Sequence, residues 1–150
     1  MFNVKDFPIM NVNGEIIVVE DDLDDQDFLA DIFESLNISN KIVFFDDPTM
    51  VVPYLLENKA YPFLVLSDIN MPKLDGFGLR QLIMSEKRLE IRFIPYIYLS
   101  TSSDPSYVDK AFRLSAQGYF KKESNFSDFQ TVIENIIAYW KKCHEPQAIL

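Results

Sequence analysis

A short apolar run that ends in a carboxylate constrains the fold of this chain more than any other feature. Residues 63–67 read Phe-Leu-Val-Leu-Ser, and Asp68 follows them, ahead of a turn that contains Pro72 and Gly76. An unbroken apolar run of this length before a turn is typical of a strand that is buried in a parallel sheet. Open α/β sheets bind their ligands at the carboxyl ends of such strands. Asp68 is therefore predicted to lie at the ligand-binding edge of an α/β fold.

Strand-like and helix-like segments alternate along the chain. Apolar runs predict five strands, at residues 16–20, 41–45, 63–68, 93–100 and 117–121. Apolar spacing and capping residues predict helices at residues 24–36, from 48 on, 77–85, from 105 on, and 127–142. Strict alternation predicts a doubly wound parallel sheet, and right-handed crossovers leave few topologies. We expect the flavodoxin-like (βα)5 order 2-1-3-4-5, whose switch point lies between strands one and three.

Several helix boundaries carry recognisable signals. Asp47-Pro48 and Asp104-Pro105 each place an N-capping carboxylate before a proline of the first turn. Pro53 predicts either a kink in the second helix or a delayed start of that helix. Ser127 and Gln130 have the spacing of a capping box at the start of the last helix.

Composition excludes several classes of protein. The formal net charge of the 150 residues is −9, which argues against a nucleic acid as partner. No apolar stretch approaches the roughly 20 residues that span a bilayer, and no signal peptide is recognisable. The single cysteine, Cys143, excludes an internal disulfide and indicates a reducing, cytoplasmic compartment. We expect residues 1–14 to form a leader, residues 15–142 one domain, and residues 143–150 a tail.

Carboxylates are predicted to converge at the edge of the sheet. Glu20 and Asp21 follow strand one and Asp68 follows strand three, its neighbour in the expected order. Like charges about 4 Å apart near a surface repel by roughly 4 kcal/mol, so this group favours a hard divalent cation such as Mg²⁺. Ser100 ends strand four, and Lys121-Lys122 end strand five. A carboxylate can also attack phosphorus to form an acyl phosphate, whose charge a metal and a lysine would neutralise.

Four motifs follow one another along the chain in a specific order. They are Val-Val-Glu-Asp-Asp at 18–22, Leu-Ser-Asp-Ile-Asn-Met-Pro-Lys-Leu-Asp-Gly at 66–76, Tyr-Leu-Ser-Thr at 98–101 and Gly-Tyr-Phe-Lys-Lys at 118–122. Together they resemble the receiver domain of two-component response regulators, over about residues 15–142. The segment after Lys122 and the later Tyr139-Trp140 pair also resemble a subgroup of stand-alone regulators that partner phytochrome-type kinases.

The resemblance implies a role for each residue at the edge of the sheet. Asp68 would be the phospho-acceptor, and Lys122, rather than Lys121, would contact the phosphoryl group. Mg²⁺ would be held by Glu20, Asp21, Asp68 and the backbone carbonyl of Asn70.

The resemblance also implies a switch, and the chain departs from the family pattern near it. Ser100 would be the switch hydroxyl, and Tyr119 the aromatic residue whose rotamer reports phosphorylation. Thr101 is larger than the residue usual after the switch hydroxyl, so we expect it to hinder hydrolysis of the acyl phosphate. Glu123 replaces the proline usual after the lysine, which removes the amide that makes a cis bond inexpensive.

Simpler interpretations stay open for these residues. Acids near the start of a helix interact favourably with its dipole and need no metal. Asp24, Asp25 and Asp27 are interpreted in this way, as solvated acids of the first turn. For Ser100 the simpler interpretation is a hydroxyl that satisfies a backbone group, and for Tyr119 it is an ordinary half-buried aromatic residue.

We therefore expect a single-domain response regulator, without a DNA-binding module, that is not a turnover enzyme apart from self-dephosphorylation. A sensor histidine kinase or a phosphotransfer protein would phosphorylate it, and its output would be a contact with an unknown downstream protein. Apolar residues near helix four, strand five and helix five, among them Tyr107 and Phe112, also suit a homodimer.

Two alternatives to this function stay open. One is a receiver-like docking module that is never phosphorylated. The other is a metal-dependent phosphohydrolase with Asp68 as its nucleophile. The phosphohydrolase is disfavoured because Asn70 stands where such an enzyme would need a second catalytic acid.

Overall fold

A five-stranded parallel sheet forms the centre of the molecule. The computed structural model describes residues 10–57, 61–89 and 94–143. The strands are β1 (Ile16–Val19), β2 (Ile42–Phe45), β3 (Leu64–Ser67), β4 (Tyr96–Ser100) and β5 (Gly118–Lys121). They lie in the order β2-β1-β3-β4-β5, and every neighbouring pair is parallel. The order expected from the sequence is confirmed.

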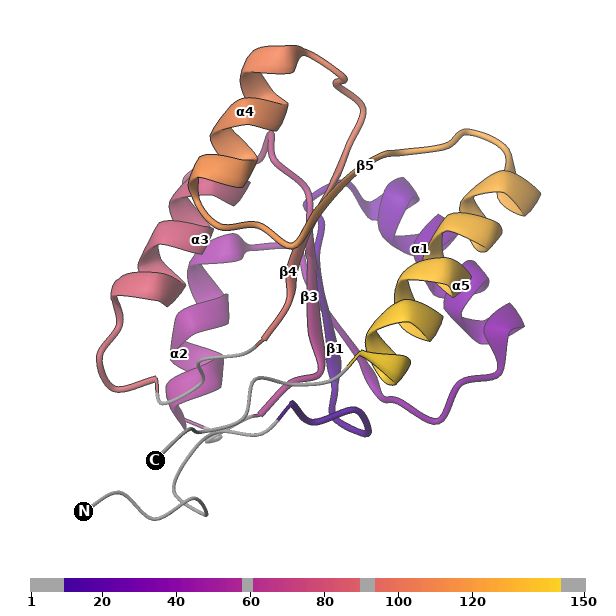
Figure 1. The fold of residues 1–150 in the computed structure, drawn as a ribbon, viewed down its shortest axis with the longest axis horizontal. Coiled ribbons are helices and arrows are strands. Elements are labelled where there is room, and N and C mark those ends of the chain that lie inside the picture. The colour runs from indigo at the N-terminus through magenta and orange to yellow at the C-terminus, as the bar shows by residue number, and fades with distance from the viewer. Residues whose placement is uncertain (1–9, 58–60, 90–93, 144–150) are drawn as a thin grey trace.

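Helices cover both faces of the sheet (Figure 1). Helices α1 (Leu23–Leu36) and α5 (Phe126–Lys142) lie on one face. Helices α2 (Val51–Glu57), α3 (Gly76–Ser85) and α4 (Pro105–Arg113) lie on the other. Within the three described stretches of the chain, no helix is both long and apolar enough to span a bilayer.

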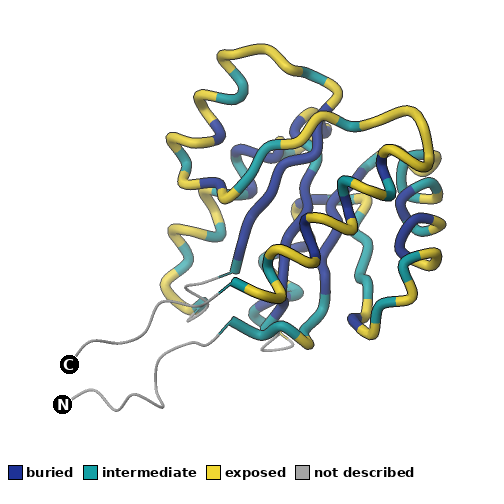
Figure 2. Tube along the Cα trace, turned by 45° about the vertical axis from the view of Figure 1, so that its right-hand side comes forward, coloured by how far each residue is buried: buried dark blue, intermediate teal, exposed yellow. Residues whose placement is uncertain are grey.

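The three central strands, β1, β3 and β4, are the most deeply buried part of the molecule, as the dark blue segments of Figure 2 show. Both β1 and β3 are buried along their whole length because helices pack on both of their faces. Side chains alternate between the two faces, so the core consists of two clusters. One cluster, under α1 and α5, contains Ile16, Ile32 and Ile133. The other, under α2, α3 and α4, contains Val65, Tyr96 and Tyr98.

The helix starts test the capping signals of the sequence. Asp47 and Asp104 cap their helices as predicted, by accepting from the N–H groups of Thr49 and Ser106. A short 3₁₀ turn at Pro48–Met50 precedes α2, so Pro53 falls in the first turn of a helix whose start is delayed.

Most ends of the strands and helices lie within one residue of the prediction, but the predicted cap of α5 and the predicted start of strand four are wrong. The capping box at Ser127 and Gln130 does not form, because α5 already begins at Phe126 and Asn125 accepts from the N–H of Asp128. Strand four begins at Tyr96 and therefore does not include residues 94 and 95, and residue 93 lies outside the described residues. Pro95 has no N–H, and it enters the sheet only through its carbonyl, which accepts from Val65 N at 2.9 Å.

The segment before β1 is held by side-chain hydrogen bonds. Asn40 Nδ2 donates to the carbonyls of Val12 at 3.0 Å and Gly14 at 2.7 Å. Residues 1–9 of the predicted leader and residues 144–150 of the predicted tail lie outside the described residues.

Candidate metal centre

Backbone pairing brings two acids to the same level of the sheet edge. Val19 pairs with Ser67 in the β1–β3 register, and the next residues along the two strands are Glu20 and Asp68. The N–H of Asp68 donates to the carbonyl of Val19 at 2.9 Å, which extends the parallel ladder by one residue. Asp21 follows Glu20, so all three acids leave the sheet at one point.

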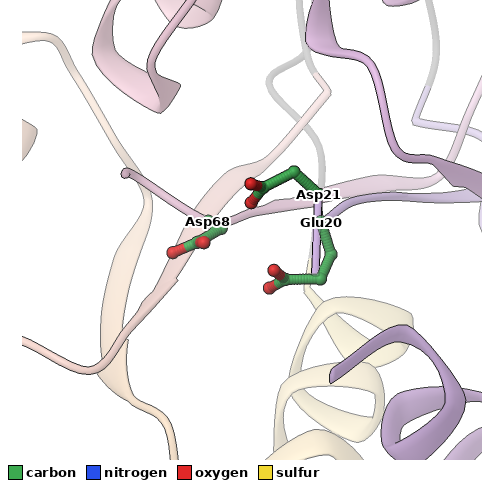
Figure 3. A group of neighbouring side chains, drawn as sticks. All are labelled: Glu20, Asp21 and Asp68. Carbon is green, nitrogen blue, oxygen red and sulfur yellow. The ribbon is translucent and has the colours of Figure 1, made fainter. Parts of the chain in front are cut away.

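The three carboxylates share one small space, as Figure 3 shows. One oxygen from each of Glu20, Asp21 and Asp68 lies within 4.8 Å of the other two. Glu20 is buried, whereas Asp21 and Asp68 are partly exposed. The convergence expected from the strand order is therefore observed. Oxygen donors of this kind, partly open to water, fit a hard divalent cation.

Lys122 completes the group from the other side. Its Nζ lies 2.6 Å from Glu20 Oε2, 3.1 Å from Asp25 Oδ2 and 3.5 Å from Asp68 Oδ2. The N–H of Lys122 donates to the carbonyl of Ser100 at 2.7 Å, which continues the pairing of β4 with β5. Lys121 is exposed, so Lys122 is the lysine that faces the acids.

Asp25 corrects one interpretation of the sequence. It was expected to be a solvated acid like Asp24 and Asp27, but it forms an ion pair with Lys122. Nothing in the local pattern separates Asp25 from its neighbours, since Lys122 lies 97 residues further along the chain.

Burial and charge shape the protonation of these groups. Burial raises the pKa of Glu20 from 4.5 to about 7, although the hydrogen bond from Lys122 opposes this. Burial also raises the pKa of Asp68, against the attraction of the Lys122 charge. Burial disfavours the charged form of Lys122, but its hydrogen bond to Glu20 and the charges of Asp68 and Glu20 outweigh burial and raise its pKa. Because burial disfavours the charged forms of Glu20 and Asp68, a bound cation would stabilise these carboxylates.

The two oxygens of Asp68 have different surroundings. The N–H of Ile69 donates to Asp68 Oδ1 at 2.8 Å, while Asp68 Oδ2 faces Lys122. One oxygen is thus fixed by the backbone, and the other is directed toward the ammonium group.

Glycine is required at position 76 to shape the loop after Asp68. The N–H of Gly76 donates to the carbonyl of Ile69 at 2.8 Å and closes the loop. A side chain at this position would collide with the carbonyl oxygen of Asp68. Two tyrosines of β4 support the loop from below, because the hydroxyls of Tyr96 and Tyr98 donate to the Gly76 carbonyl at 3.0 and 3.4 Å. No pattern in the sequence indicates these hydrogen bonds, since the tyrosines stand in an ordinary apolar run.

Ser100 and Tyr119 both bond to the same residue of the β4–α4 loop. Ser100 is buried, and its Oγ accepts from Ser102 N at 3.1 Å, so it does satisfy a backbone group. The hydroxyl of Tyr119 donates to the carbonyl of Ser102 at 2.6 Å, and its ring is half-buried. Thr101 and Asn70 are both exposed. The described residues contain no cis peptide bond, so the bond before Glu123 is trans, as the sequence indicated.

Comparisons with known proteins agree with this geometry. The family model for the response regulator receiver domain matches residues 16–134. The response regulator Rcp1 of Synechocystis sp. is 26% identical over 131 residues, which cover 83% of this chain and 87% of that protein. The probable methanogenesis regulatory protein FilR2 of Methanothrix harundinacea is 29% identical, over 83% of this chain and 82% of that protein.

Solved structures of receiver domains share the fold. The phosphorylated cyanobacterial phytochrome response regulator RcpA superposes with a TM-score of 0.76 and 26% identity, over 87% of this chain and 95% of that one. The Mn²⁺-bound form of Rcp1 gives a TM-score of 0.75 and 25% identity, over 90% of this chain and 99% of that one.

Proposed function

This chain belongs to the family of response regulator receiver domains, and on that premise we propose that Asp68 accepts a phosphoryl group whose arrival changes a protein contact. The observation that carries the proposal is the placement of Asp68 among two other carboxylates and Lys122 at the mouth of the sheet. The donor would be a sensor histidine kinase or a phosphotransfer protein, and the setting would be the cytoplasm.

Mg²⁺ is the proposed cofactor. Glu20, Asp21, Asp68 and the backbone carbonyl of Asn70 would hold it, because all of these donors are oxygens. The related Rcp1 has been solved with Mn²⁺ bound, a cation that suits the same kind of ligands. When bound, the cation would neutralise the charge that gathers between Asp68 and the incoming phosphoryl group.

The transfer step would use the oxygen of Asp68 that faces Lys122. Asp68 Oδ2 attacks the phosphorus of a phosphohistidine, a new P–O bond forms, and the P–N bond breaks with its electron pair left on the histidine nitrogen. Lys122 would donate to the oxygens of the transferred group, while the N–H of Ile69 keeps the other Asp68 oxygen in place.

The proposed output surface consists of α4, β5 and α5. Ser100 and Tyr119 would carry the change to it, since both bond to Ser102 at the start of the loop into α4. Phe112 on α4 is 55% exposed and Phe120 on β5 is 37% exposed, which gives this surface apolar area for a downstream protein or a second copy of the chain.

Thr101 is proposed to prolong the phosphorylated state. It lies exposed beside Ser100, where its side chain would restrict the approach of water to phospho-Asp68. Replacement of Thr101 with alanine is expected to shorten the half-life of the acyl phosphate, measured by intact mass after the phosphodonor is removed. An unchanged or longer half-life would contradict this role.

Phosphorylation itself is tested with a small phosphodonor. The native protein, incubated with Mg²⁺ and acetyl phosphate, is expected to gain the mass of one phosphoryl group, and Asp68→Asn is expected to gain none. No added mass on the native protein would favour the docking module. Repeated turnover of an aryl phosphate would favour the phosphohydrolase.

A further inference from the structure

The ammonium group of Lys122 forms its shortest contacts with carboxylates other than Asp68, the proposed phospho-acceptor. Lys122 Nζ donates hydrogen bonds to Glu20 at 2.6 Å and Asp25 at 3.1 Å. Its approach to Asp68 Oδ2, at 3.5 Å, is the longest of its three contacts with carboxylates. We propose that Asp25 is a positioning residue that holds Lys122 toward α1 and thereby slows the phosphorylation of Asp68. This inference rests on the proposed function.

Asp25 differs from the other two partners of Lys122 in its relation to the cation. Glu20 and Asp68 both belong to the group of oxygens that fits a divalent metal, whereas Asp25 does not. A cation between the acids would compete with Lys122 for the charge of Glu20 and Asp68. Asp25 would then be the carboxylate that keeps its full attraction for Lys122, at the moment when the lysine must turn to the phosphoryl group.

The position of Asp25 is fixed by the start of α1. Asp22 caps this helix, and its Oδ1 accepts from the N–H of Asp25 at 3.0 Å. The side chain of Lys122 is only 10% exposed, so water offers the ammonium few substitutes for its protein partners. Because Lys122 is confined and Asp25 is anchored, we expect their contact to persist until a stronger acceptor displaces it.

The size of the effect is limited by solvent. The side chain of Asp25 is 47% exposed, and ion pairs of this exposure stabilise weakly. Loss of the Asp25 carboxylate is therefore expected to raise the rate of phosphorylation by about two- to five-fold.

The experiment compares two variants with the same change in charge. Asp25→Asn and Asp24→Asn each remove one negative charge from the first turn of α1, but in the described structure Asp24 does not contact Lys122. Each protein is incubated with acetyl phosphate and Mg²⁺, and phosphorylation is followed by intact mass. Asp25→Asn is expected to react faster than Asp24→Asn. Asp25→Glu keeps a carboxylate at this partly exposed position and is expected to react at close to the native rate.

A second background identifies the path of the effect. When Lys122 is replaced with methionine, Asp25→Asn and Asp24→Asn are expected to react equally fast, because no ammonium group is left for the Asp25 carboxylate to hold. Equal rates of the two variants in the native background would overturn the role of Asp25, and so would a slower Asp25→Asn. A faster Asp25→Asn in both backgrounds would overturn it as well, since the effect would not pass through Lys122.

The native protein separates this inference from the function on which it rests. Absence of phosphate on the native chain would overturn the proposed function and the role of Asp25 together. A phosphorylated native chain with equal rates in the two variants would overturn only the role of Asp25. Thermal unfolding of each variant shows that the rates compare folded proteins.

Discussion

The two faces of the sheet bury different kinds of side chains. Under α1 and α5, the buried cluster contains only aliphatic residues and phenylalanine. Under α2, α3 and α4, it also contains Tyr96 and Tyr98, whose hydroxyls bond to the loop after Asp68. The side chains of the first cluster carry no polar group that could bond to the site, whereas the buried tyrosines of the second face connect the core to the site through hydrogen bonds.

Ring contacts extend the second face from the site to the proposed output surface. The centroid of the Tyr98 ring lies 5.3 Å from that of Phe77 and 6.3 Å from that of Tyr119. The ring centroids of Phe77 and Tyr107, which is on α4, lie 5.9 Å apart. A shift at Gly76, where the loop after Asp68 enters α3, would be transmitted to α4 and β5 through these packed side chains. The difference between the faces therefore predicts that mutations of buried apolar side chains on the first face change stability alone, and that mutations of the buried tyrosines on the second face also change the site.

The largest effect is expected on the first face. Ile133 on α5 is fully buried, and its replacement with alanine should lower the free energy of unfolding by about 2–5 kcal/mol. Urea unfolding measures this loss, and Ile133→Val, which removes one methylene, should lose about 0.5–1.5 kcal/mol. Acetyl phosphate should label the folded fraction of Ile133→Ala at the native rate. A slower rate in the folded fraction would contradict the prediction that buried apolar residues of the first face change stability alone.

The second largest effect is expected from a cation at the carboxyl edge of the sheet, where Glu20, Asp21 and Asp68 lie between the two faces. Binding of Mg²⁺ to the acid group should stabilise the native protein, by about 1.4 kcal/mol at ten times the dissociation constant. Removal of the cation with a chelator should reverse the gain, and Asp68→Asn should lose most of it, because one of three clustered carboxylates is then neutral. Thermal unfolding with and without Mg²⁺ measures both. Equal stabilisation of native protein and Asp68→Asn would place the cation elsewhere.

A smaller effect is expected from a hydroxyl of the second face. Replacement of Tyr96 with phenylalanine removes the 3.0 Å hydrogen bond to the Gly76 carbonyl and should lower the free energy of unfolding by about 0.5–1.5 kcal/mol. Hydrogen exchange should become faster in residues 69–76, since the loop loses one of its two tyrosine supports. Tyr139→Phe on α5, where the side chain is 64% exposed, is the matched control and should leave the loop unchanged. Unaltered exchange in Tyr96→Phe would remove the link between this face and the site.

The sequence predicted what depends on neighbours along the chain. The strand order, the caps at Asp47 and Asp104 and the convergence of the three carboxylates all follow from the order of short patterns. The cap of α5 was misplaced because Asn125 and Ser127 are both capping residues and the sequence alone does not rank them. The contact of Asp25 with Lys122 and the bonds of the β4 tyrosines depend on packing between distant segments, which no local pattern encodes.

The smallest effect lies at the outer rim of the second face, where an ion pair joins the loops that follow β2 and β3. Lys73 Nζ donates to Asp47 Oδ2 at 2.8 Å, and this hydrogen bond, with those from Thr49, lowers the pKa of Asp47 from 3.8 to about 2. A lowered carboxyl pKa stabilises the folded state above the ordinary value, and this stabilisation is lost as the pH falls from about 4 to about 2.

Asp47→Asn should therefore be less stable than the native protein at neutral pH and equally stable near pH 2, in thermal unfolding across that range. Lys73→Gln leaves the Asp47 cap in place and should lose part of the same pH dependence. Both variants should be labelled by acetyl phosphate at the native rate, because the pair bonds neither to the tyrosines of β4 nor to the three acids. A constant difference in stability down to pH 2 would mean that neither Lys73 nor the cap lowers the pKa of Asp47 in the folded state.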